Sequence, residues 1–388
     1  MKELNSIVQS LKPSGIRKFF DLANTMEGVI SLGVGEPDFN TPWHVCENAY
    51  YSMNQGHTHY TANRGLLSLR QEICRFHKDR YQQIYDPELE TLVTVGGSEA
   101  IDLAMRTLIN PGDEVIVLDP NYVAYTPAIE LAGGIPVKIQ LKEEYGFKLL
   151  PSDLENAITD KTKAMIINYP SNPTGGIMTK EDYAKIVPII HQHELYVVSD
   201  EIYAELCFEE PFASLAQFPE VRDQIIVING FSKAFAMTGW RLGYILSNPI
   251  ISSAMTKIHQ YTIMSAPTAS QYAGLEAMRN GIHDIEIMRA DYCHRRNLLV
   301  NRLNRMGLIT NLPHGTFYVF PNIECTNLSS DAFCERLLNE QKVACVPGTA
   351  FGESGEGFIR ISYAYSLDHI IEACDRIEIF MKQFKKRV

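Results

Sequence analysis

Residues 230–243 read GFSKAFAMTGWRLG, a stretch of small and apolar residues that carries one lysine and one arginine. The apolar runs Ile225–Ile228 and Leu242–Leu246 flank this stretch and have the length and the β-branched content of buried strands. We therefore expect the lysine to follow a buried strand, and the same alternation continues outward along the chain.

Short apolar runs alternate with helix-like segments from about residue 90 to 250. Further strand candidates are Leu92–Val95, Glu114–Leu118, Pro136–Leu141, Ala164–Ile167 and Tyr196–Ser199. Ala100–Leu108 and Thr179–Gln192 have the apolar periodicity of helices. This alternation predicts an α/β fold in which a mostly parallel central sheet is flanked by helices on both faces.

Polar residues gather where these predicted strands end. The clusters are Gly96–Glu99, Asp119–Tyr122, Asn168–Thr174, Asp200–Tyr203 and Asn229–Lys233. Because ligands bind beyond the carboxyl ends of the strands in such sheets, five clusters of this kind predict one shared site.

The last hundred or so residues follow a different pattern. A long charged helix over Asp284–Met306 precedes strand-like and helical segments, which are Gly315–Phe320, Ser330–Gln341, Val343–Val346, Gly357–Tyr363 and Leu367–Phe384. This mixture predicts a smaller α+β domain. We expect a large domain over residues 42–285 and a discontinuous small domain made of residues 1–41 and 286–388.

Composition narrows the class of protein. The chain has 388 residues, 45% of them hydrophobic, and a formal net charge of -11, so neither nucleic acid nor an anionic membrane is expected as a partner. Eight cysteines stand singly, which is typical of reduced residues in the cytoplasm. The pairs His57/His59 and His191/His193 lack further ligands at suitable spacing, so no metal site is predicted.

Lys233 is the residue in the opening stretch with the most specific chemistry. Burial lowers the pKa of a lysine, and a neutral amine can then attack an aldehyde to form a Schiff base. Ser232 and Arg241 lie close by in the sequence, and arginine offers a fork of donors that suits phosphate oxygens. An isolated Ser-Lys pair after a turn is more often a surface feature. The interpretation of Lys233 as a Schiff-base lysine therefore depends on the whole of residues 230–243.

Residues 230–243 resemble the lysine signature of class I aminotransferases, the aspartate and aromatic type with pyridoxal-phosphate (PLP) fold type I. The resemblance extends over nearly the whole chain. It implies that PLP is the cofactor, that Lys233 holds it as a Schiff base, and that Lys233 carries the proton during transamination between an L-amino acid and a 2-oxo acid.

Three further residues gain roles from this resemblance. Asp200 matches the carboxylate that stabilises the protonated pyridine nitrogen, and Tyr203 matches the phenol that binds the ring oxygen. Asn172, in the Asn-Pro-Thr-Gly loop, matches the amide near the same oxygen and the substrate. From the residues alone, Asp200 also fits a helix N-cap, and the loop also fits an ordinary turn.

The phosphate of the cofactor is expected at Gly97, Ser98 and Glu99, where amides at a helix N-terminus attract anions. Gly-Gly-Ser is also a common turn. The resemblance places Ser232 and Arg241 at the same phosphate, whereas the side chain of Glu99 should point away from it. Tyr122 falls where the family stacks an aromatic ring on the cofactor.

The resemblance also assigns residues to the substrate and to a partner chain. Arg360 matches the arginine that binds the substrate α-carboxylate, and Gly35 lies in the strip that approaches it. An outward-facing arginine on a strand remains the alternative for Arg360. Tyr60 matches the tyrosine that reaches the phosphate of the neighbouring subunit, which predicts a homodimer with shared sites.

Several functions stay open on this fold. A β C–S lyase or a cyclopropane-forming synthase would use the same residues, whereas a PLP-sensing regulator would need a DNA-binding extension that the sequence lacks. Aromatic amino acids, aspartate and acetylated diaminopimelate are the candidate donors, with 2-oxoglutarate as acceptor. An apolar donor pocket is predicted from the N-terminal segment, the Tyr60 loop and the Tyr261–Pro267 stretch of the partner chain, with Arg17 or Arg64 as a partner for a second carboxylate. These segments offer Phe19, Phe20, Tyr60, Tyr261, Ile263 and Met264.

Overall fold

A seven-stranded sheet forms the centre of the computed structural model, which describes residues 2–11 and 26–384. Its strands, in spatial order, are β2 (Thr91–Thr94), β8 (Gly243–Leu246), β7 (Ile225–Gly230), β6 (Tyr196–Asp200), β5 (Thr162–Asn168), β3 (Glu114–Asp119) and β4 (Ile135–Gln140). Only β8 runs antiparallel to its neighbours β2 and β7, and the other pairs are parallel. The predicted mostly parallel sheet is confirmed.

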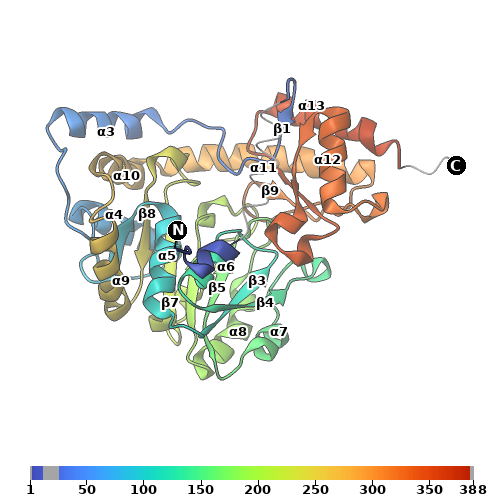
Figure 1. The fold of residues 1–388 in the computed structure, drawn as a ribbon. Helices are drawn as coiled ribbons and strands as arrows, with labels where there is room; N and C mark the ends of the chain where they lie inside the picture. Colours follow the sequence, from blue (N-terminus) through green and yellow to red (C-terminus); the bar gives the residue numbers. More distant parts are fainter. Residues whose placement is uncertain (1, 12–25, 385–388) are drawn as a thin grey trace.

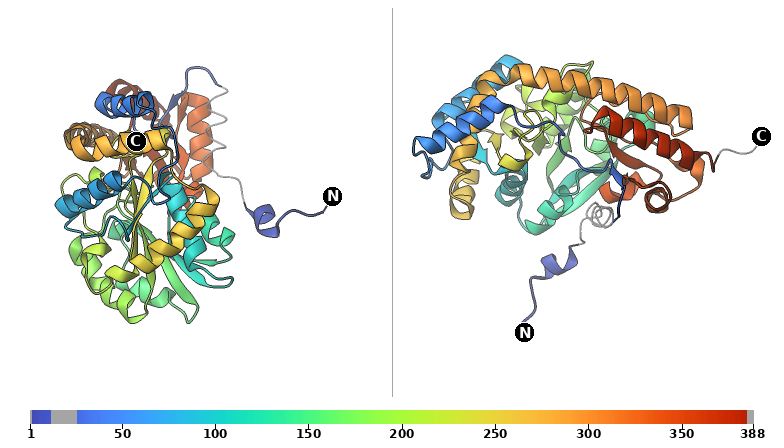
Figure 2. Two further views of the ribbon diagram at one scale, coloured as in Figure 1. Left: turned by 90° about the vertical axis from the view of Figure 1, so that its left-hand side faces the viewer. Right: turned by 90° about the horizontal axis from the view of Figure 1, so that it is seen from above.

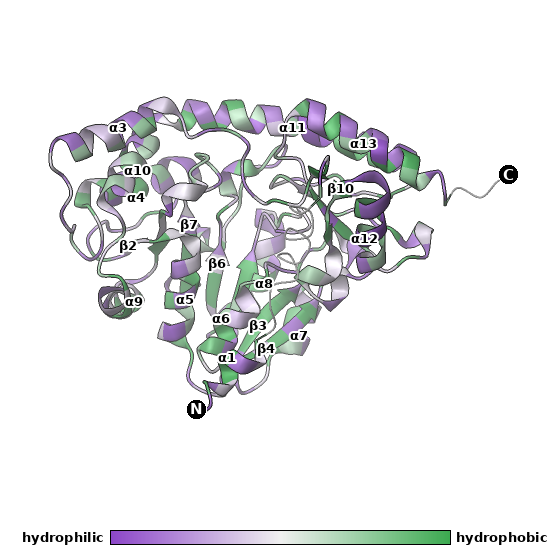
Figure 3. Cartoon of the chain, turned by 45° about the horizontal axis from the view of Figure 1, so that its top comes forward, coloured by the Kyte–Doolittle hydropathy of each residue, from purple (hydrophilic) through white to green (hydrophobic). Residues whose placement is uncertain are grey.

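Helices cover both faces of this sheet because apolar side chains point to both sides of its strands. Val115 and Val117 pack toward the helices α5 (Gly96–Leu108), α6 (Tyr125–Leu131) and α9 (Pro249–Thr262). Ile116 and Leu118 face the opposite side, which α4 (Leu67–Tyr81), α7 (Pro151–Ala157), α8 (Lys180–Gln192) and α10 (Thr268–Asn280) cover. Such two-sided burial explains why the strands read as continuous apolar runs, which Figure 3 shows in green.

A second apolar cluster lies beside the sheet at the end that holds the C-terminus (Figure 1). It contains residues of α11 (Ile282–Met306), α12 (Ser330–Gln341), α13 (Leu367–Met381), β9 (Tyr318–Val319) and β12 (Ile359–Ser362). The N-terminal strand β1 (Ile30–Ser31) joins this cluster by pairing in parallel with β10 (Val343–Ala344). Among the described residues, α1 (Ser6–Ser10) and α3 (Trp43–Asn54) also precede the sheet in the sequence.

Two predicted strands of the C-terminal part are wrong in extent. The predicted strand Gly315–Phe320 is reduced to β9, because Thr316 adopts a φ of 66° and Gly315 makes only an isolated bridge with Cys207. Val343–Val346 is split at Cys345, because β10 pairs with β1 whereas β11 (Val346–Pro347) pairs with β12. The sequence shows the β-prone residues but not the change of partner.

The helix α11 crosses between the two clusters (Figures 1 and 2). Ile285 belongs to the apolar cluster that includes Ile116 and Leu118, and from Met288 onward the buried apolar residues of α11 belong to the second cluster. The helix ends at Gly307, whose φ of 97° closes it in the left-handed conformation that glycine adopts freely. Since one helix serves both clusters, the predicted domain boundaries at residues 42 and 285 stay a prediction.

Within residues 2–11 and 26–384, no helix combines the length and the apolar character needed to cross a bilayer. The described part of the chain also contains no group of three or more His, Cys, Asp or Glu side chains placed to hold a metal ion. His57, one of the histidines considered above, stacks on the ring of Tyr272 with 4.9 Å between the ring centroids.

Candidate active site

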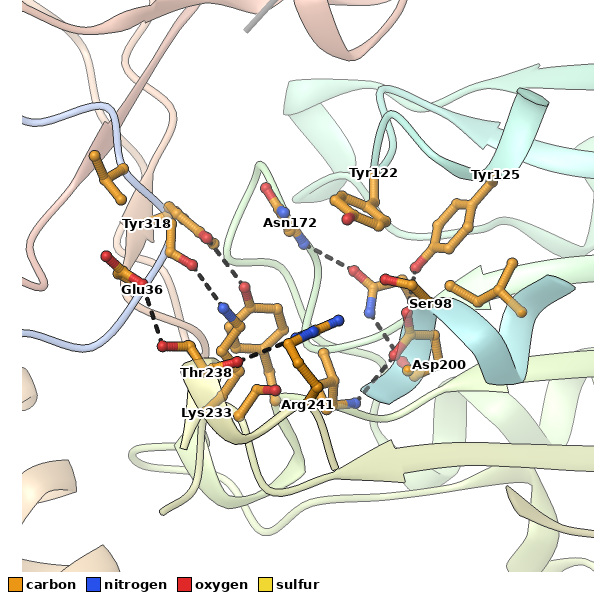
Figure 4. A pocket seen from close by; sticks show the side chains of 18 of the residues that line it. Glu36, Ser98, Tyr122, Tyr125, Asn172, Asp200, Lys233, Thr238, Arg241 and Tyr318 are labelled. Carbon is orange, nitrogen blue, oxygen red and sulfur yellow. Dashed lines mark hydrogen bonds between the residues drawn. The ribbon is translucent and has the colours of Figure 1, made fainter. Parts of the chain in front are cut away.

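A cavity of about 540 Å³ opens at the carboxyl edge of the sheet, between the sheet and the second cluster. Residues from all five strand-end clusters line it: Gly97 and Ser98, Tyr122, Asn168 and Asn172, Asp200 and Tyr203, and Ser232 and Lys233. Gly35, Arg241 and Arg360 line the same cavity. Figure 4 shows side chains from segments far apart in the sequence converging on this cavity, among them Ser98, Asn172, Asp200, Lys233 and Arg241.

The amine of Lys233 is held in the middle of this cavity, just after β7. Its Nζ donates a hydrogen bond to the carbonyl oxygen of Gly35, 2.6 Å away. The side chain thus connects the end of β7 to the N-terminal segment that contains Gly35. The pKa of Lys233 is lowered to about 8, chiefly by burial; Glu36 opposes the shift, and Arg360 and Arg241 contribute to it. A substantial fraction of the amine is therefore neutral near pH 8, as nucleophilic chemistry requires.

Asp200 stands at the end of β6 with its carboxylate fixed by two donors. Its Oδ2 accepts a hydrogen bond from the hydroxyl of Tyr125 at 2.7 Å, and its Oδ1 accepts one from the backbone N–H of Ile202 at 3.2 Å. Burial raises the pKa of Asp200 to about 6, although the Tyr125 hydrogen bond acts in the opposite direction. A buried carboxylate that still ionises near neutral pH can stabilise a cation placed in the cavity.

The N-terminus of α5 and the guanidinium of Arg241 lie side by side. Gly96 has a φ of 71°, and a Cβ at this position would come within 2.7 Å of the Nη2 of Arg241. Arg241 itself adopts a φ of 49°, and its Nη1 donates to the carbonyl oxygen of Thr238. Because the first N–H groups of a helix have no partner within it, they and Arg241 make a site suited to an anion.

The side chain of Glu99 points away from this anion site, as expected. Its Oε2 accepts a hydrogen bond from the backbone N–H of Val95 at 2.5 Å, and its Oε1 accepts one from the Nδ1 of His259 at 2.6 Å. The carboxylate is thereby turned from the cavity, and only the backbone of Glu99 is available to an anion.

Arg360, on β12, is held for binding by contacts on every side. Its Nη1 donates to the Oδ1 of Asn172 at 2.8 Å and its Nη2 to the carbonyl oxygen of Gly33 at 2.6 Å. The guanidinium lies between the rings of Tyr318 and Phe351, 4.3 and 4.6 Å from their centroids. Its Nε is buried without a hydrogen-bond partner among the described residues.

A pair of phenols closes the side of the cavity opposite α5. The hydroxyl of Tyr203 lies 3.0 Å from that of Tyr318, and burial raises the pKa of Tyr203 well above its ordinary value. Tyr203 therefore stays protonated and can donate a hydrogen bond into the cavity. Tyr122 lines the cavity too, with its ring edge-on to Tyr125 at 5.5 Å between the centroids.

The chain has clear relatives among known proteins. The family model described as aminotransferase class I and II matches residues 27–377. The chain belongs to this family. Its members of class I use PLP, and the aminotransferase architecture seen here, a mostly parallel sheet with flanking helices, is that of their fold type I structures.

Three relatives cover nearly the full length of this aminotransferase. YugH of Bacillus subtilis is 52% identical over 97% of this chain and 98% of its own. The aspartate aminotransferase of Pyrococcus abyssi is 43% identical over 97% of each chain. The crystal structure of the aromatic aminotransferase of Pyrococcus horikoshii matches with a TM-score of 0.90 and 41% identity, and covers 95% of this chain and 99% of its own.

Some of the residues singled out in the sequence lie away from the cavity of the aminotransferase. Tyr60 and Tyr261 are 81% and 89% exposed, and Ile263 and Met264 are 41% and 43% exposed. Arg64 does not line this cavity either, and its Nη1 donates to the Oγ of Ser252 at 2.6 Å, so its role toward a second carboxylate stays a prediction. The other predicted pocket residues Arg17, Phe19 and Phe20 fall outside the described residues.

The sequence analysis missed three polar side chains of the aminotransferase site. Tyr125 binds Asp200, Tyr318 contacts both Tyr203 and Arg360, and Asn168 donates to the backbone of Asp200 at 2.9 Å and accepts from the backbone of Asn172 at 3.0 Å. Asn168 lies inside a predicted strand-end cluster, so its position gave a usable signal. Tyr125 and Tyr318 gave none, because their contacts depend on how helices and sheets pack.

Proposed function

We propose that the chain is a PLP-dependent aminotransferase that moves an amino group from an L-amino acid to a 2-oxo acid, with Lys233 bonding the cofactor. The single observation that carries the proposal is the buried amine of Lys233, whose lowered pKa of about 8 is combined in one cavity with the carboxylate of Asp200. A neutral amine and a fixed carboxylate are the two groups that this chemistry requires of the protein.

The donors in the cavity fit PLP. The backbone amides of Gly97, Ser98 and Glu99, together with Ser232 and Arg241, would hold the phosphate. The cradle has room for it, since a Cβ on Gly97 would meet no atom outside its neighbours closer than the Cγ2 of Ile228 at 3.7 Å.

The remaining lining groups suit the pyridine ring. Asp200 would hold the ring nitrogen in its protonated form, because its own pKa of about 6 leaves it largely ionised at neutral pH. Tyr203 and Asn172 would bind the ring oxygen, and Tyr122 would contact the face of the ring. When bound, PLP supplies an electron sink for the α-carbon of the amino acid.

The substrate would be oriented by its α-carboxylate. Arg360 presents a planar guanidinium that lines the cavity together with Gly35 and Asn172, and its Nη1 bonds the Oδ1 of Asn172. Lys233 would then take the α-proton at Nζ and return it as a general acid. Arg241 would bind the phosphate of the cofactor, whereas Arg360 would bind the α-carboxylate of the substrate. Each anionic group would thus have its own arginine.

We propose an aromatic or other bulky apolar amino acid as donor and 2-oxoglutarate as a common acceptor. The described residues that line the cavity include three cations, Lys233, Arg241 and Arg360, and each already has a task. None of them is left for a second carboxylate of the donor, so the distal carboxylate of 2-oxoglutarate would need a cation from outside this lining, for which Arg17 and Arg64 are the candidates. The apolar lining, among it Val34 and Ile202, offers no charge to such a group.

A homodimer with shared sites is part of the proposal. Exposed aromatic and apolar side chains gather where the segment around Tyr60 meets that around Met264, since Asn63 donates to the carbonyl oxygen of Met264 and Thr268 to that of His59. A partner chain would cover these side chains and bring its own Tyr60 to the phosphate. The eight free cysteines support a cytoplasmic location.

The test is kcat/KM for phenylalanine, tyrosine, aspartate and acetyl-diaminopimelate with 2-oxoglutarate as acceptor. An aspartate or acetyl-diaminopimelate value more than ~100-fold above both aromatic values, about 2.7 kcal/mol, would overturn the donor class. Turnover of a sulfur amino acid without any 2-oxo acid would overturn amino transfer itself and favour a C–S lyase.

A further inference from the structure

We propose that His259 and Glu99 form a positioning pair that holds the turn before α5 in the shape that binds the cofactor phosphate. This inference rests on the proposed function, because it gives the pair a task only if the N-terminus of α5 receives a phosphate group. Neither side chain lines the cavity, so both act through the backbone of Gly97 and Ser98.

Both carboxylate oxygens of Glu99 are committed to fixing this turn. Oε2 accepts from the N–H of Val95, the residue that precedes α5 and has no polar side chain with which to cap it. Oε1 accepts from the Nδ1 of His259 at 2.6 Å, and the two side chains are only 11% and 0% exposed. The pair therefore joins the start of α5 to the neighbouring helix α9 in a place shielded from water.

His259 stands where the pattern of α9 calls for an apolar residue. Ile251 and Met255 precede it at intervals of four, and both belong to the apolar cluster on this face of the sheet. The Nε2 of His259 is buried without a hydrogen-bond partner among the described residues. A histidine with one unsatisfied nitrogen in an apolar stripe points to a task for its other nitrogen, which is the bond to Glu99.

The bond decides where the negative charge of Glu99 lies. A carboxylate in the first turn of a helix is attracted by the same N–H groups that would bind phosphate. With His259 in place, Glu99 is turned back onto Val95 and leaves the amides of Gly97 and Ser98 to the cofactor. Without His259, the carboxylate would compete with the phosphate and loosen the turn.

The experiment compares cofactor-free wild-type protein with His259→Leu by titration with pyridoxal phosphate and with pyridoxal, which lacks the phosphate. We expect His259→Leu to weaken pyridoxal phosphate binding about tenfold or more, while pyridoxal binding changes less than about threefold. His259→Asn can donate from Nδ2 toward Glu99 and should restore part of the preference for the phosphate form, and it also covers the case in which the leucine variant does not fold.

The matched control is His77→Leu, which removes a histidine that is also fully buried but bonds Gln83 and Tyr244 away from the cavity. It should lower thermal stability without changing the ratio of the two affinities. Equal weakening of both ligands by His259→Leu, or no weakening at all in the folded variants, would overturn the positioning role. A wild-type protein with no preference for pyridoxal phosphate over pyridoxal would instead remove the proposed function on which the pair depends.

Discussion

Replacing Lys233 with methionine should stabilise the cofactor-free protein, because it removes an amine that the fold holds in an unfavourable place. Burial lowers the pKa of Lys233 from 10.5 to about 8. A difference of roughly 2.5 units corresponds to about 3 kcal/mol of unfolding free energy at pH 7. Since the side chain is partly exposed through the cavity, this is an upper limit, and we expect about 1–3 kcal/mol.

The sign of this effect sets its pH dependence. Between pH 8 and 10.5 the unfolded chain keeps the proton of Lys233 while the folded chain has lost it, so raising the pH through this window stabilises the wild-type protein. The methionine variant lacks this contribution. The stability gap between the two proteins should therefore be largest at pH 7 and shrink by up to about 2.5 kcal/mol at pH 10.

The assay is urea unfolding of both cofactor-free proteins at pH 7 and pH 10, at one protein concentration. Lys257→Met, on the exposed side of α9, serves as the control, and its gap from the wild type should not depend on pH. The difference in unfolding free energy between Lys233→Met and the wild type should change between pH 7 and pH 10. A difference that stays constant within about 0.5 kcal/mol would refute the reasoning that burial lowers the pKa of this amine.

Three further outcomes follow from the site. Asp200→Ala should still bind PLP but lose more than about tenfold in kcat, or ~1.4 kcal/mol, and a smaller loss would show that the ring nitrogen has another partner. Mixing Tyr60→Phe chains with Lys233→Ala chains should give more activity than the two preparations do separately, because one site of the mixed dimer regains every group; a simple sum would exclude shared sites. Arg360→Lys should raise KM for the amino donor about tenfold or more with a smaller change in kcat, since lysine cannot form a bidentate pair, and an unchanged KM would remove Arg360 from the α-carboxylate.

The sheet and the position of the cavity could be predicted from the sequence because both depend on short-range patterns. Strands buried on both faces read as apolar runs, and the polar clusters that follow them meet at one edge of a parallel sheet. Lys233 and Asp200 lie in these clusters, whereas their roles were assigned through the family resemblance, and burial now explains why the pKa of the amine is lowered and that of the carboxylate is raised.

Contacts that arise only on packing could not be predicted. The hydroxyl of Tyr125 reaches Asp200 across 75 residues, and nothing in its neighbourhood distinguishes it from an ordinary buried tyrosine. Tyr318 likewise becomes part of the site only when β9 and β12 bring it beneath Arg360.

The most direct test of the central claim locates the covalent bond between cofactor and protein. The protein is loaded with PLP, reduced with borohydride, digested and analysed by mass spectrometry for the lysine that carries the pyridoxyl group. The account predicts a single modified peptide, the one containing Lys233, and no stable modification in Lys233→Ala. A pyridoxyl group on any other lysine, with Lys233 unmodified in active protein, would contradict it.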